Sequence, residues 1–161
     1  MEIINNTFQL SDGTIVGCNF YDTNGTQRYR SVNEALYKKV DGCIIIYDIT
    51  NKNSFDEIEN YFIPKIKEKC KENIPVLIIG NKIDMNDNRK VSTEEGKELA
   101  SKYGFIFNET SSIENLNIND IFRIIIEITN NYCIKNREEN ENNNPIRIEH
   151  QIEQRRCFNC C

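Results

Sequence analysis

Two short, continuously apolar runs constrain the fold of this chain more than any other feature. Residues 43–47 read CIIIY and residues 76–79 read VLII, and polar residues bound both runs. Runs of this length without polar alternation are typical of parallel strands that are buried on both faces of a sheet. Residues 105–107, which read FIF, predict a third and weaker strand of the same kind.

Helices are expected between these strands. Ser54 predicts the start of a helix that runs to about Lys71, and Pro64 inside it predicts a kink. Ser92 and Glu95 have the spacing of a capping box, which predicts a helix that runs to Tyr103. A long last helix is predicted by four positions that fall on one helical face, namely Ile118, Phe122, Ile125 and Thr129.

The first residues predict an antiparallel hairpin. Residues 7–10 and 14–21 resemble strands, and the turn Ser11-Asp12-Gly13 joins them. The alternation of strand and helix that follows indicates an α/β fold with a mainly parallel sheet.

Composition and net charge argue against several kinds of partner and site. The net charge of −5 argues against nucleic acid as the main partner, and the only histidine, His150, lies in the polar tail. Histidine-based catalysis and a histidine metal site are therefore not expected. Single cysteines in or beside apolar runs predict free thiols in a reducing, cytosolic compartment, and these are Cys18, Cys43, Cys70 and Cys133. No signal peptide and no membrane-spanning run is expected.

Three polar motifs follow predicted strands. Residues 22–25 (DTNG) follow the hairpin, residues 81–84 (NKID) follow the VLII strand, and residues 109–112 (ETSS) follow the FIF strand. Ligands of α/β proteins bind at the carboxyl ends of parallel strands. The three motifs therefore predict a ligand site at one edge of the sheet.

From Ile3 to the tail, the chain resembles the Ras superfamily of small GTPases, and YDTNGTQRYR with the Cys-Cys ending looks most like the Rab branch. The resemblance implies a three-layer, P-loop NTPase-like fold. It also implies that Asp84 accepts both ring donors of guanine, which adenine lacks. Asn81 and Lys82 would frame the base, and the loop through Ser111 and Ser112 would place a backbone donor on the guanine carbonyl. The family usually has Ala and Lys where this chain has Ser112 and Ile113.

The same resemblance assigns the phosphate side. Asp22 matches the acid that holds Mg²⁺ through water, and Gly25 matches the glycine whose amide meets the terminal phosphate of GTP. Thr26 stands where active relatives have the glutamine that orients the attacking water. Threonine is shorter and has no amide, so fast hydrolysis is not expected.

The phosphate loop of the family is missing from the sequence. No Gly-Lys-Ser or Gly-Lys-Thr occurs, and roughly forty residues of the family pattern, including the first switch, precede the point at which the match begins. Losing three charge-assisted contacts costs ~4–9 kcal/mol, or roughly three to six decades of affinity. Tight binding of GTP or GDP with Mg²⁺ is therefore not expected from this chain by itself.

The family's first strand, also missing here, would lie between the hairpin and the CIIIY strand. Three outcomes are open: the hairpin packs directly on the CIIIY strand, another segment fills the slot, or the monomer is poorly stable.

The sequence predicts a division into a truncated Rab-like G domain, residues 1–135, and a disordered tail, residues 136–161. Residues 136–144 are rich in Asn and Glu without an apolar face. Cys160 and Cys161 are adjacent thiols, and two hydrocarbon chains are what a stable lipid anchor needs. They predict a lipid anchor, and the Rab resemblance implies that the lipids are geranylgeranyl groups that hold the chain on the cytoplasmic face of an intracellular or plasma membrane.

The resemblance also implies partners. The Rab escort and prenylation machinery would engage the tail, where residues 146–148 (IRI) resemble a docking motif, and effectors would contact Arg28, Tyr29 and Arg30 in the second switch. Three functions stay open. The chain is a vesicle-traffic protein with an incomplete GTP site, or a working GTP switch with a further upstream segment, or an interaction module that engages the prenylation machinery without nucleotide.

Overall fold

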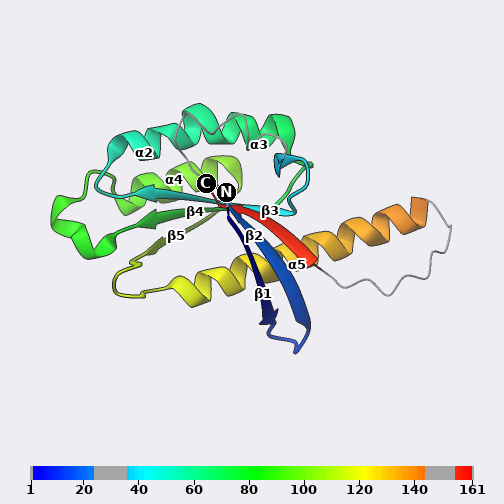
Figure 1. Ribbon diagram of the computed structural model, residues 1–161. Helices are drawn as coiled ribbons and strands as arrows, with labels where there is room; N and C mark the ends of the chain where they lie inside the picture. Colours follow the sequence, from blue (N-terminus) through cyan, green and yellow to red (C-terminus); the bar gives the residue numbers. More distant parts are fainter. Residues whose placement is uncertain (1, 24–35, 144–154, 161) are drawn as a thin grey trace.

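The computed structural model describes residues 2–23, 36–143 and 155–160, with side chains described through residue 139. A six-stranded sheet in the order β1-β2-β6-β3-β4-β5 forms the middle layer. The strands are β1 (Glu2–Gln9), β2 (Ile15–Asp22), β3 (Gly42–Asp48), β4 (Val76–Asn81), β5 (Ile106–Thr110) and β6 (Arg155–Cys160). Helices α2 (Lys52–Glu57), α3 (Ile63–Lys69) and α4 (Thr93–Tyr103) cover one face, and α5 (Ile118–Asn143) covers the other (Figure 1).

The predicted α/β fold with a mainly parallel sheet and an N-terminal hairpin is confirmed. Strand β3 pairs in parallel with β4, and β4 with β5. The hairpin pairs antiparallel from Glu2↔Asp22 to Gln9↔Ile15, so its first strand begins earlier than the sequence predicts. Gly13 has φ of 85° in the turn, a conformation that glycine adopts without a steric penalty.

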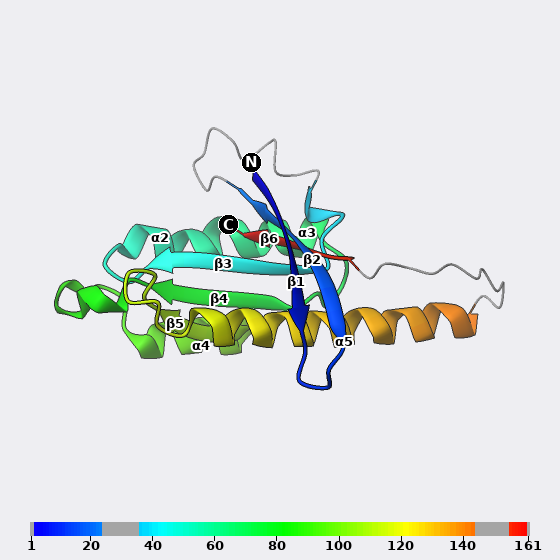
Figure 2. The same cartoon turned by 60° about the horizontal axis from the view of Figure 1, so that its bottom comes forward.

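The slot between the hairpin and β3 is filled by the tail. Strand β6 pairs in parallel with β2 from Gly17↔Arg155 to Asp22↔Cys160, and with β3 from Gly42↔Phe158 to Ile44↔Cys160. Figure 2 shows β6 between β2 and β3. Of the three outcomes that the sequence left open, a different segment fills the slot.

This arrangement corrects the expectation of a disordered tail at two places. Helix α5 continues past Lys135 to Asn143, and residues 155–160 form a strand. The Asn- and Glu-rich residues extend a helix that already has several turns, and adding residues to a formed helix is far easier than starting one. The division of the chain at residue 135 stays a prediction.

The helix after β3 begins at a different residue from the one predicted, but its predicted irregularity near Pro64 is present. Asn51, not Ser54, is the N-cap of α2, because its side chain accepts a hydrogen bond from the Asn53 N–H at 3.1 Å. The Ser54 hydroxyl instead donates to the Asn51 carbonyl at 2.7 Å. A π-helical turn, η2 (Ile58–Phe62), separates α2 from α3 just before Pro64, so the predicted irregularity is present.

Helix α4 confirms its predicted capping box. The Ser92 hydroxyl accepts from the Glu95 N–H at 3.1 Å, and the Glu95 carboxylate accepts from the Ser92 N–H at 2.8 Å. The helix ends at Tyr103, followed by Gly104 with φ of 69°.

The sheet separates two apolar cores. One lies against α2, α3 and α4 and contains Tyr47, Ile45 and Ile78. The other lies against α5 and contains Ile44, Ile125 and Phe20. Among the described helices, none combines the length and the apolar character needed to cross a bilayer.

Candidate functional site

The second and third polar motifs meet at the carboxyl edge of the sheet. Strands β4 and β5 pair so that Asn81 lies opposite Thr110. The Asn81 Oδ1 atom accepts hydrogen bonds from the Thr110 hydroxyl at 3.1 Å and from the Ser112 N–H at 3.3 Å. It also accepts from the Ser112 hydroxyl at 3.2 Å. Asn81 therefore fixes the start of the loop that follows β5.

Asp84 is held from the same loop. The buried Ser111 hydroxyl donates to Asp84 Oδ1 at 2.6 Å and accepts from the Glu114 N–H at 3.1 Å. Within the described part of the chain, Asp84 Oδ2 takes part in no hydrogen bond, and the side chain is half-buried. The carboxylate is thus oriented by one oxygen while acceptor capacity remains for a ligand with two adjacent N–H groups.

Lys82 lies between these two residues in the left-handed conformation, with φ of 71° and ψ of 40°. Its Nζ atom is 2.6 Å from Asp48 Oδ2 at the end of β3. Burial raises the pKa of Asp48, but the Lys82 and Thr50 hydrogen bonds outweigh that effect, so the net pKa is lowered. Lys82 therefore connects the β4 loop to β3 and keeps its aliphatic chain partly exposed.

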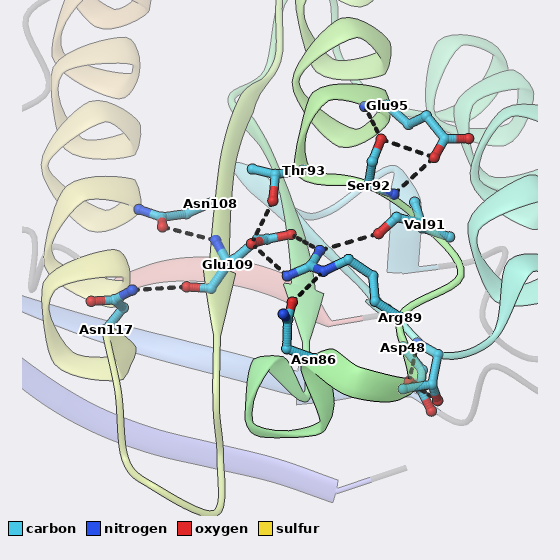
Figure 3. A network of polar contacts seen from close by, with 11 residues as sticks. Asp48, Asn86, Arg89, Val91, Ser92, Thr93, Glu95, Asn108, Glu109 and Asn117 are labelled. Carbon is cyan, nitrogen blue, oxygen red and sulfur yellow. Dashed lines mark hydrogen bonds and ion pairs between the residues drawn. The ribbon is translucent and has the colours of Figure 1, made fainter.

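A network of polar contacts connects the segment after β4 to β5, and the sequence did not predict it (Figure 3). Arg89 Nη1 and Nη2 donate to the two Glu109 carboxylate oxygens at 2.6 and 3.1 Å. The Thr93 hydroxyl also donates to Glu109, at 3.1 Å. Hydrogen bonding to Glu109 raises the pKa of Arg89.

The loop between β5 and α5 is closed on itself. The Asn117 side-chain amide donates to the Glu109 carbonyl at 3.0 Å, and Ser111 and Leu116 form an isolated β-bridge. Asn115 and Asn117 have positive φ, which asparagine tolerates better than most residues. The loop therefore presents Ser111 and Ser112 in a fixed arrangement.

The phosphate-side residues are only partly described. Asp22 ends β2 with an exposed side chain, and its register partners are Glu2 in β1 and Cys160 in β6. Gly25 and Thr26, the switch residues 28–30, residues 146–148 and Cys161 lie outside the described residues. The structure thus brings together Asn81, Asp84, Ser111 and Ser112, with Lys82 adjacent, and records no contact between them and Asp22.

Two hollows border the site on the α5 side of the sheet. The smaller, about 310 Å³, is lined by Asn81, Thr110 and Ser112 together with apolar side chains. The larger, about 790 Å³, lies between the hairpin and the start of α5 and is lined by Phe8, Phe20, Ile46, Phe122 and, at its polar side, Asp22. Ile46 is 43% exposed although it belongs to an interior strand. No group of three or more metal-ligating side chains occurs in the described ranges.

Comparisons of the sequence with known proteins identify its family. A sequence model of the Ras family matches residues 2–131. The chain is 41% identical over 111 residues to Ras-related protein Rab-8A of Bos taurus and to Ras-related protein Rab-8B of Homo sapiens. These matches cover 69% of this chain and 53% of each relative, so the chain spans about half the length of the curated relatives it matches.

Proposed function

The chain belongs to the Ras family and is Rab-like, and on that basis we propose that it is a prenylated, membrane-associated protein of vesicle traffic with a guanine-selective half-site. The motifs at the carboxyl edge read the base, and the cysteine pair carries the lipids. Hydrolysis is slow or absent, because Thr26 has no amide to orient a water.

One observation carries the proposal. Asp84 is fixed by Ser111 through Oδ1 and leaves Oδ2 without a hydrogen bond among the described residues. A half-buried carboxylate in that state accepts two adjacent N–H groups of guanine, and adenine cannot supply them. The Ser112 N–H and hydroxyl both donate to Asn81 Oδ1, and these hydrogen bonds hold the loop after β5 against the end of β4.

GTP or GDP with Mg²⁺ is the ligand that this site would take. Asp22 would hold the ion through a water, and Gly25 would donate to the terminal phosphate. A single exposed carboxylate fits Mg²⁺ only when the phosphates of the nucleotide supply further oxygen ligands. The chain's own contribution is therefore selection of the base.

Binding of fluorescent GDP and GTP to the purified chain tests this function. We expect the fluorescent nucleotides to bind weakly and to be displaced by unlabelled guanine nucleotides but not by adenine nucleotides. The Asp84→Asn variant should lose this preference for guanine. The exposed residue Asp87 provides the matched control, Asp87→Asn, which should bind like the parent. Equal displacement by adenine nucleotides, or no binding by a chain that is folded by circular dichroism, would overturn the proposal.

Lipidation accounts for Cys160 and Cys161. In each transfer, the cysteine sulfur attacks C1 of geranylgeranyl diphosphate, a C–S bond forms, the C–O bond breaks, and diphosphate and the thiol proton leave. The escort and prenylation proteins would be the partners for this step. The Cys160→Ser/Cys161→Ser double variant should remain in the soluble fraction of cells, and its recovery with membranes would count against the anchor.

A second function, a working GTP switch completed by an upstream segment, is favoured by the 790 Å³ hollow. An interior strand residue, Ile46, and two aromatic side chains, Phe20 and Phe122, line this uncovered space. A segment that supplied a phosphate loop would cover that surface. An upstream reading frame that encodes Gly-Lys-Ser or Gly-Lys-Thr, with tight GDP binding by its product, would establish this function in place of the first.

A further inference from the structure

We propose that docking of the tail regulates its own lipidation: while residues 155–160 are docked as β6, Cys160 is withheld from lipid transfer. The proposal rests on the proposed lipidation of Cys160 and Cys161 and adds its regulation. Lipid transfer then requires that the strand leave the sheet.

The backbone pairing of β6 shows how completely the segment is engaged. All six of its residues pair with β2, from Arg155 to Cys160. Its last three residues also pair with β3, and Cys160 lies between Asp22 on one side and Ile44 on the other. Cys160 is therefore an interior residue of the sheet, with a strand on each side.

A transferase cannot act on a cysteine in that position. The enzyme must bind the residues around the thiol as an extended peptide and bring the sulfur to C1 of the diphosphate donor. An interior strand has already used its backbone hydrogen bonds on both sides. The same residues can therefore pair with the sheet or bind the enzyme, but not both at once. The rate of lipid transfer is then lowered in proportion to the fraction of chains in which β6 is undocked.

The edges of β2 and β3 on either side of β6 favour its docked position. No direct pairing joins β2 and β3 in the strand order, so departure of β6 would open two strand edges at the centre of the sheet. Those edges are apolar: Cys18 and Phe20 in β2 and Ile44 in β3 are all buried. Docking gives the backbone groups along these edges their hydrogen-bond partners.

The first test measures thiol reactivity. Phe158 pairs with both Phe20 and Gly42, so Phe158→Pro removes a backbone donor in the middle of the docked strand. Labelling by N-ethylmaleimide, followed by peptide mass spectrometry, should give Cys160 a rate about tenfold or more above that of the parent chain. A synthetic peptide of residues 152–161, with and without the substitution, is the control and should label at one fast rate.

The second test locks the strand in place. Asn19 lies opposite Cys157, and neighbouring strands are about 4.8 Å apart, within the ~4.4–6.8 Å Cα separation of disulfides. In Asn19→Cys, diamide would oxidise the two thiols to a disulfide and be reduced to the hydrazine. The locked chain should accept geranylgeranyl groups at least about tenfold more slowly than the same chain after dithiothreitol.

The outcomes separate the two proposals. If neither Phe158→Pro nor the peptide accepts lipid from the transferase and its escort, the lipidation itself is wrong. If the peptide is lipidated but parent and Phe158→Pro chains are labelled and lipidated at equal rates, the gate is wrong. Failure of the Asn19→Cys disulfide to form would also contradict the docked strand.

Discussion

Replacing Glu109 by Gln tests the polar network that connects the two loops of the candidate site. Arg89 lies after β4 and Glu109 lies within β5, so their pair ties together the segments that carry Asp84 and Ser111. The side chains of Arg89 and Glu109 are only 19% and 15% exposed. The substitution preserves size and removes one charge.

The expected cost follows from the contacts. Charge-assisted hydrogen bonds contribute about 1.5–3 kcal/mol each, and the pair makes two, at 2.6 and 3.1 Å. The glutamine amide keeps one acceptor but turns an N–H₂ group toward a guanidinium donor. Arg89 retains its bond to the Val91 carbonyl at 3.1 Å, which limits the loss. The free energy of unfolding should fall by about 2–3 kcal/mol, below the ~3–5 kcal/mol of a fully buried broken pair.

Urea unfolding and thermal melting measure this change. The melting temperature of Glu109→Gln should fall by roughly 5–10 °C for a chain of this size. Glu98 is exposed on α4, and Glu98→Gln is the matched control, with an expected change within about 0.5 kcal/mol. If Glu109→Gln were no less stable than this control, the pair would not hold the loops together and the reasoning above would be refuted.

Three further changes test the packing and the charges. Tyr47 Oη is buried without a hydrogen-bond partner in the described structure, so Tyr47→Phe should leave the melting temperature unchanged or raise stability by up to about 1 kcal/mol. In Gly96→Ala, the new Cβ would overlap the Phe107 ring, so thermal melting should show a loss of about 1–3 kcal/mol despite the better helix propensity. Hydrogen bonds from the Lys52 ammonium and from Ser92, the N-cap residue of α4, lower the pKa of Glu95 to about 2. The folding stability that the Glu95 carboxylate contributes is therefore present above about pH 4.5 and is lost as the pH falls toward 2. Because that side chain is 43% exposed, the loss should be about 1 kcal/mol, and urea titrations of Glu95→Gln between pH 5 and 2 should lack it.

The parts of the fold that local patterns specify were predictable. The CIIIY and VLII runs became interior strands, and the Ser92–Glu95 capping box fixed the start of α4. The N-cap of α2 was misplaced because Asn51 and Ser54 are both good cap residues. In the structure the Asn51 side chain accepts from the Asn53 N–H, and the Ser54 hydroxyl donates back to the Asn51 carbonyl.

Long-range pairing was not predictable in the same way. Residues 155–160 (RRCFNC) have no alternation of apolar and polar residues, and their strand exists because β2 and β3 offer unpaired edges. In the candidate site, the NKID and ETSS motifs predicted the side chains that meet at the carboxyl edge of the sheet. The Arg89–Glu109 pair spans 20 positions and has no local signature. Glu109 is the first residue of the ETSS motif, but Arg89 lies five residues after Asp84, so nothing in the sequence connects the two.

The position of β6 also dictates when this sheet can be completed during synthesis. A ribosome makes residues 155–160 after every other strand of the sheet, yet that segment joins the hairpin to β3. Until it emerges, the nascent chain holds a hairpin and a three-stranded parallel unit with nothing to bridge them. Sheets closed by such distant pairings form slowly and leave apolar edges open to other chains. Completion of this sheet therefore waits for its last strand, and until then the growing chain exposes the strand edges that chaperones shield.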